Sequence, residues 1–203
     1  MHNKNIINKE KKLIELAISQ GGYFTAKQAL KLGYSYRAQN YYVRTKQWLK
    51  KDRALYRFSF LPVLKEDELI KACFWSRDKK DIPQAVISHE SAISVYGIGE
   101  IIPDKISLTV SKSFRKKPPK KYLIYKTDLT NKEIEKKDFF KVTGIVKTIT
   151  DIVEKIDPEQ LKKIIEDAYK KGLLSQHKLE LSNTSVEIKR KLLSIFAEVR
   201  NKR

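Results

Sequence analysis

The chain has 203 residues, 41% of them hydrophobic, which is enough for one large domain or two small ones with real cores. Its 43 Lys and Arg residues against 24 Asp and Glu give a net charge of +19, which predicts a polyanionic partner such as nucleic acid or anionic lipid. A single cysteine excludes an internal disulfide, and three scattered histidines provide no metal-ligand spacing, so no cofactor or metal is expected. No apolar run approaches the ~20 residues of a membrane span, and no signal-peptide core follows Met1, which predicts a soluble, cytoplasmic protein with no membrane partner.

The positive charge is concentrated at the N-terminus. Residues 1 to 62 hold 13 Lys and Arg and 3 Asp and Glu, a net +10, whereas the remaining 141 residues carry only +9. Composition changes at Leu61-Pro62, which is followed by the acidic helix start Glu66-Asp67-Glu68. We therefore predict a small basic domain over residues 1–62 and a second domain over residues 63–203.

Local signals in the first domain predict a winged helix-turn-helix. Apolar residues at helical spacing around Leu13 and Ala17 predict a first helix that ends before Gly21-Gly22. Thr25 and Gln28 fit a capping box that opens a second helix, and Gly33 and Ser35 form a tight turn into a third helix that ends near Lys46. The segment from Trp48 to Phe60 predicts a basic β-hairpin, the wing.

The second domain mixes helices and strands, so the expected fold class of the whole chain is α+β. The expected strands are 85–87, 106–110, 122–125 and 139–143, and the expected helices are 66–75, 88–96, 148–156, 158–171 and 186–199. In the 158–171 helix, Asp157 is the expected N-cap and Gly172 the stop.

The third helix has the composition of a base-reading helix. The 100° step per residue places Arg37, Asn40, Tyr41 and Arg44 on one face that has no acidic side chain. Arginine makes bidentate contacts with guanine and asparagine with adenine, so this face suits the major groove. The alternative is an ordinary solvated helix face.

Other polar residues flank this helix where they can position the protein on phosphates rather than read bases. Basic side chains in the hairpin also protect sheet edges from aggregation, which is the alternative interpretation for the wing. The predicted phosphate contacts are Thr25, Ser35, Lys46, Lys50, Lys51, Arg53 and Arg57.

A second basic concentration lies between Ser111 and Thr127, a stretch with no acidic residue. It either extends the nucleic-acid footprint or is a solvated loop between strands, and the sequence does not favour one over the other. The candidate additional DNA contacts are Arg115, Lys116, Lys117, Lys120 and Lys121.

Catalytic motifs are weak, and we do not expect an enzyme. His89-Glu90 is the most suggestive pair, but adjacent residues on a helix point about 100° apart and no second histidine completes a metal site. Carboxylates in late helices, such as Asp151 and Glu166, are expected to be solvated or paired with lysines such as Lys147 and Lys170. Cys73 is expected to be a buried core thiol.

In this order the motifs resemble the AbiEi antitoxin family of abortive-infection toxin–antitoxin systems, over nearly the full chain. The resemblance rests on the wing end Ala54-Leu-Tyr-Arg57, the helix start Ser88-His-Glu-Ser-Ala92, and the segments 105–110, 142–143, 148–152 and 168–175. One departure is Ala54, where family members more often have glycine.

The resemblance implies a bifunctional protein of the type IV class. Its N-terminal domain would bind inverted repeats in its own promoter as a repressor, and its C-terminal domain would counteract a nucleotidyltransferase-like toxin without a stable complex. The residues alone indicate DNA binding, whereas the antitoxin role comes from the resemblance. Two alternatives stay open: a nucleic-acid-processing enzyme targeted by its winged helix, and a winged-helix regulator with a ligand-sensing domain.

Overall fold

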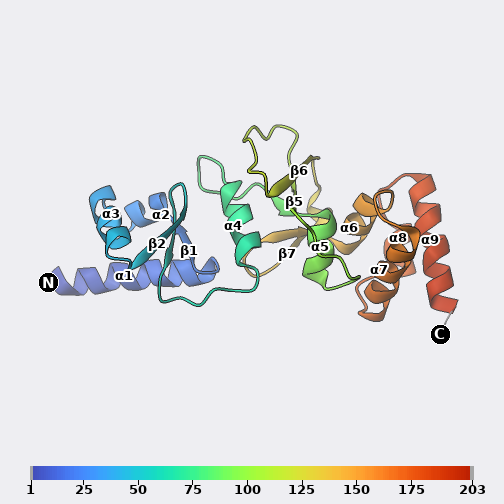
Figure 1. Cartoon of the computed structure of the whole chain (residues 1–203), viewed down its shortest axis with the longest axis horizontal. Helices are drawn as coiled ribbons and strands as arrows, with labels where there is room; N and C mark the ends of the chain where they lie inside the picture. The colour runs from blue at the N-terminus through green and yellow to red at the C-terminus, as the bar shows by residue number, and fades with distance from the viewer. Residues whose placement is uncertain (1, 202–203) are drawn as a thin grey trace. The chain divides into compact units, whose positions relative to one another are not determined.

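The computed structural model describes residues 2–201, with side chains from residue 8 onward, and the chain is α+β, as predicted. Helices alternate with short strands that form a three-stranded and a five-stranded sheet (Figure 1). The chain divides into two compact units. The first comprises Met1–Gln84 with Asp138–Phe140, and the second comprises Ala85–Lys137 with Lys141–Arg203.

The first unit extends further along the chain than the boundary predicted near Pro62. Helix α4 (Asp67–Trp75) follows that proline, yet it belongs to the first unit. The hydroxyl of Tyr23 donates a hydrogen bond to Asp67 over 2.9 Å, and the Tyr23 ring lies 5.9 Å from the Phe74 ring. The composition shift at Pro62 therefore marks a turn within the first unit, because the apolar face of α4 completes the packing there.

The helices and the hairpin expected in the first unit are present in the expected order. Helix α1 ends just before Gly21 and Gly22, whose positive φ angles of 68° and 94° let the chain reverse. The sheet is antiparallel in the order β1-β3-β2. The elements are α1 (His2–Ser19), β1 (Tyr23–Thr25), α2 (Ala26–Lys31), α3 (Tyr36–Arg44), β2 (Trp48–Asp52) and β3 (Leu55–Phe58).

Strand β1 was not predicted, because three residues are too short to show alternation. It forms by pairing with β3, where Tyr23 lies opposite Arg57. This pairing places Phe24 in an aromatic core. The Phe24 ring lies 4.7 Å from Trp48 in an edge-to-face contact and 5.0 Å from Phe58. Leu13 of α1 is fully buried in the same cluster, so one core holds helices and sheet together.

The five-stranded sheet of the second unit has the order β6-β5-β4-β8-β7. The pairs β4–β5 and β7–β8 are antiparallel, whereas β5–β6 and β4–β8 are parallel. The bounds are β4 (Val86–Ile87), β5 (Ile106–Val110), β6 (Tyr122–Lys126), β7 (Ile134–Lys136) and β8 (Lys141–Thr143). The strand predicted over 139–143 is present as β8 but is limited to Lys141–Thr143. Strand β7 and the 3₁₀ turn Asn131–Glu133 before it were not predicted, because each has only three residues.

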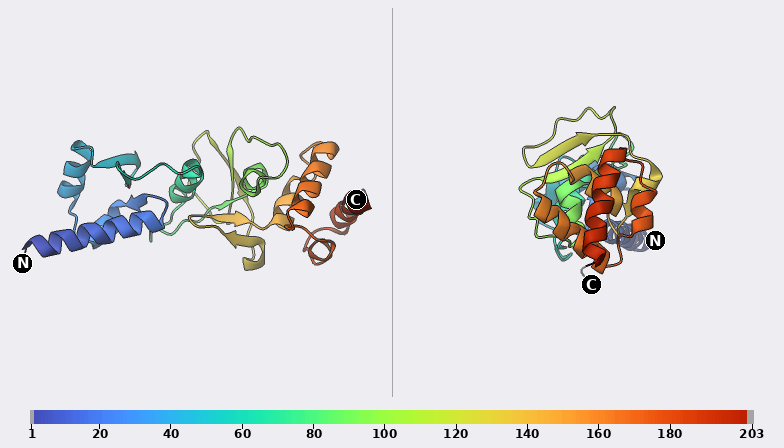
Figure 2. Two further views of the ribbon diagram at one scale, coloured as in Figure 1. Left: turned by 90° about the horizontal axis from the view of Figure 1, so that it is seen from below. Right: turned by 90° about the vertical axis from the view of Figure 1, so that its right-hand side faces the viewer.

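The helices of the second unit lie in the chain largely where they were predicted. Gly97, with a φ of +63°, ends α5 (His89–Tyr96), and the Asp157 side chain caps α7 (Pro158–Lys170) by accepting the Glu159 N–H over 2.9 Å. Helix α6 (Ile145–Ile152) begins at Ile145, after the N-cap Gly144, which is earlier than the predicted Thr148. The short α8 (Gln176–Glu180) was not predicted. Helix α9 (Val186–Asn201) packs against α7 and α8 (Figure 2).

Candidate nucleic-acid interface

Helix α3 is held in place by contacts on its inner side. Ser35 caps it by accepting the Ala38 N–H over 3.2 Å. Gln39 is buried and its side-chain amide donates to the carbonyls of Ala26 and Tyr34, at 3.1 and 2.9 Å. The ring of Tyr42 stacks on Trp48 at 4.9 Å. Because the inner side is pinned to α2 and β2, the outer face has a fixed orientation.

The outer face of α3 carries the four residues predicted to read bases. Arg37, Asn40, Tyr41 and Arg44 are all exposed, as the helical spacing requires. The Arg44 guanidinium lies 5.9 Å from the Tyr41 ring, which is within cation–π range. The helix contains no acidic residue. The structure therefore brings these four side chains together on one solvent-facing, cationic and aromatic surface.

The hairpin of β2 and β3 presents three of the predicted phosphate contacts to solvent. Lys50, Lys51 and Arg53 are exposed, and the register shifts between Lys50 and Asp52. Ala54 closes the turn with a φ of +53°, a conformation that costs a non-glycine residue about 1 kcal/mol and that glycine adopts without strain. Ser35 and Lys46, which flank α3, are exposed as well.

Two of the predicted phosphate contacts were wrong, because both side chains are buried. Arg57 is 1% exposed, and its Nη2 donates to the carbonyl oxygens of Leu61 (3.0 Å) and Pro62. Thr25 is also 1% exposed; its hydroxyl accepts the Gln28 N–H and donates to Asp81 over 2.6 Å. Arg57 therefore fastens β3 to the following turn, and Thr25 completes the capping box.

Replacing Arg57 by alanine is expected to lower the free energy of unfolding of the first unit by about 2 kcal/mol. The carbonyls of Leu61 and Pro62 lose their charged hydrogen-bond donor. Part of this loss is offset because the variant no longer has to bury a charged guanidinium. Urea unfolding followed by the fluorescence of Trp48 and Trp75 measures this, since both tryptophans lie in the first unit. Exposed Lys51→Ala is the control and should leave stability unchanged. A stable Arg57→Ala protein with weaker salt dependence of DNA binding would restore the phosphate-contact hypothesis.

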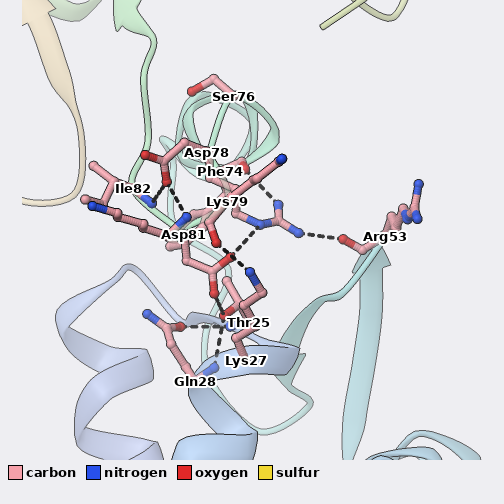
Figure 3. Close-up of polar contacts among 12 residues, drawn as sticks. Thr25, Lys27, Gln28, Arg53, Phe74, Ser76, Asp78, Lys79, Asp81 and Ile82 are labelled. Carbon is pink, nitrogen blue, oxygen red and sulfur yellow. Dashed lines mark hydrogen bonds and ion pairs between the residues drawn. The ribbon is translucent and has the colours of Figure 1, made fainter.

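A polar network at the start of α2 was not predicted from the sequence (Figure 3). It joins Thr25 and Lys27 to the loop that follows α4. Arg77 donates from Nη2 to the carbonyl of Arg53 in the wing turn, at 2.6 Å, and its Nε lies 3.5 Å from Asp81. No local sequence pattern predicts these contacts, since Thr25 and Asp81 are 56 residues apart.

The second basic concentration forms the connection between the parallel strands β5 and β6. Residues 111–121 contain no helix or strand, as the interpretation of this segment as a loop requires. All five predicted side chains on it are exposed: Arg115, Lys116, Lys117, Lys120 and Lys121. The loop therefore offers a cationic surface of its own within the second unit.

The His89 region of the second unit is closed rather than open to a substrate. His89 is 4% exposed, has a φ of +51°, and stacks on Tyr125 with ring centroids 3.5 Å apart. Ser88 is fully buried; its hydroxyl accepts from Thr109 over 2.8 Å and lies 3.0 Å from Nδ1 of His89. Burial, with lesser effects of Lys155 and Lys147, lowers the pKa of His89 to about 3. The ring is therefore neutral and enclosed.

Of the two expectations for the late carboxylates, solvation or pairing, the structure shows pairing with lysines for Asp151 and Glu166. Asp151 pairs with Lys147, and Glu166 with Lys170 at 2.5 Å. Cys73 is buried, as predicted. Within residues 2–201 no group of three or more His, Cys, Asp and Glu side chains is arranged to hold a metal ion.

No protein-family model matches the chain, and no curated protein matches it. Among the helices of the described residues, none is both long and apolar enough to span a membrane.

Proposed function

We propose that the first unit is a winged helix-turn-helix that binds duplex DNA. Helix α3 is the reading helix, with Arg37, Asn40, Tyr41 and Arg44 in the major groove, and Lys50, Lys51 and Arg53 of the wing lie against phosphates. The observation that carries this proposal is the acid-free outer face of α3, which Gln39 and the Tyr42–Trp48 stack hold rigidly. A preformed reading face loses little entropy on binding.

We further propose that the chain acts as an AbiEi-type antitoxin of a type IV system in the cytoplasm. In this role it represses its own promoter by binding inverted repeats there, and its C-terminal part counteracts a nucleotidyltransferase-like toxin without forming a stable complex. The DNA-binding part is supported by the first unit, whereas the antitoxin part rests on the sequence resemblance alone. Enclosure of His89 and Ser88 supports a non-enzymatic second unit over the nucleic-acid-processing alternative.

Two assays test this proposal with the full chain. Fluorescence anisotropy compares the duplex upstream of its own coding sequence with a shuffled duplex of the same composition. We expect tighter binding to the first and a steep fall of both affinities with salt, since each neutralised phosphate adds about 0.9 to the slope. Equal binding to the two duplexes would reject the repressor role. Failure of the chain to restore growth when the neighbouring gene is expressed would reject the antitoxin role.

A further inference from the structure

The segment Arg77–Ile82, here called the α4 loop, contacts both the start of α2 and the wing. At one end of α2, Lys27 Nζ donates to the carbonyl of Lys79 and Thr25 donates to Asp81. At the wing, Arg77 donates to the carbonyl of Arg53. The loop is thus fastened at once to the start of α2 and to the turn of the wing (Figure 3).

Both acidic side chains of the α4 loop make polar contacts within the first unit. Asp81 is 15% exposed; its two carboxylate oxygens face Thr25 and Arg77. Its φ of +65° is a strained conformation for a residue other than glycine, and the two contacts offset this cost. Asp78 remains exposed, but its Oδ1 accepts the backbone N–H groups of Lys80 and Ile82.

The lysines of the same region face solvent. Lys79 and Lys80 are exposed, and so is Lys27 on the first turn of α2. With Asp78 as the one exposed acid among these four residues, the local surface has a net charge of +2. In helix-turn-helix proteins the first helix of the pair crosses the DNA backbone, and the wing is proposed above to lie against phosphates. Because the loop contacts both elements, its lysines lie beside both surfaces.

We propose that the α4 loop is an additional phosphate-contacting element, which binds the sugar–phosphate backbone of duplex DNA through Lys79 and Lys80 beside Lys27. This inference rests on the DNA-binding function proposed above. Phosphate contacts fix orientation without reading sequence, so the loop strengthens binding to all duplexes alike and sets the angle at which α3 enters the groove.

The test is the salt dependence of DNA binding by the full chain. The double variant Lys79→Ala/Lys80→Ala is measured by anisotropy on the upstream duplex over a range of salt concentrations. Removal of two phosphate-binding lysines should reduce the slope of log affinity against log salt by about 2. Lys79→Arg/Lys80→Arg keeps both charges and should keep the wild-type slope. Fluorescence of Trp48 and Trp75 checks that each variant is folded.

A charge-matched control separates a local contact from an effect of net charge. Lys132→Ala/Lys136→Ala removes two exposed lysines from the second unit and should leave the slope at the wild-type value. A wild-type slope in the Lys79/Lys80 alanine variant, or an equal reduction in the control, would overturn the role of the α4 loop while leaving the reading helix intact. Absence of DNA binding by the wild-type chain would overturn both.

Discussion

Alanine at Arg37 or at Arg44 should abolish much of the preference for the chain's own promoter, because each bidentate arginine–guanine pair contributes about 1 to 3 kcal/mol of discrimination. Both guanidinium groups are exposed on the outer face of α3, so their removal should not change the free energy of unfolding. The measurement is anisotropy with the upstream duplex and its shuffled counterpart. Affinity for the first should fall more than affinity for the second.

Lys50→Ala/Lys51→Ala in the wing is the matched control for this experiment. These lysines are also exposed but are proposed to meet phosphates, so their removal should weaken binding to both duplexes by similar factors and lower the salt slope. If a variant of Arg37 or Arg44 lowered the affinity for both duplexes by the same factor, that residue would contact the DNA backbone rather than read bases. Unchanged binding to both would remove α3 as the reading helix.

The sequence predicted those features of the first unit that depend on neighbouring residues. The capping box of Thr25 and Gln28, the left-handed Gly33 and the Ser35 cap all act within a few residues, and each is present. The exposed face of α3 follows from the same short-range periodicity. A helix start needs only a side chain that reaches the next turn, so a linear pattern is enough to locate it.

Features that depend on distant parts of the chain were not predictable in this way. A basic residue in a hairpin is usually solvated, but Arg57 is buried because the chain turns back at Leu61 and Pro62 and offers two carbonyls. Thr25 is likewise covered by Asp81. The sequence of α4 does not indicate which unit the helix belongs to. Its assignment to the first unit depends on the contacts of Tyr23 with Asp67 and Phe74. Such contacts are tertiary, and they override local expectation.

Acidification should destabilise the second unit through His89, by about 3 kcal/mol between neutral pH and pH ~4.5. Burial, and then Lys155 and Lys147, lower the pKa of His89 from 6.5 to about 3 in the folded protein. Below pH ~6.5 the unfolded chain binds a proton that the folded chain does not, so stability falls as the pH drops toward 3. Above pH ~6.5 His89 is neutral in both the folded and the unfolded chain, so none of this stability is lost there.

The measurement is urea unfolding at several pH values, followed by far-UV circular dichroism because both tryptophans lie in the first unit. His89→Asn is the matched control: asparagine tolerates the φ of +51° and does not titrate. Burial also raises the pKa of Asp151, which titrates in both proteins and therefore cancels in the comparison. The difference in stability between wild type and His89→Asn should thus shrink or reverse as the pH falls. A difference that stays constant with pH would mean that the folded protein protonates His89 as readily as the unfolded chain does, and that the stack on Tyr125 opens in solution.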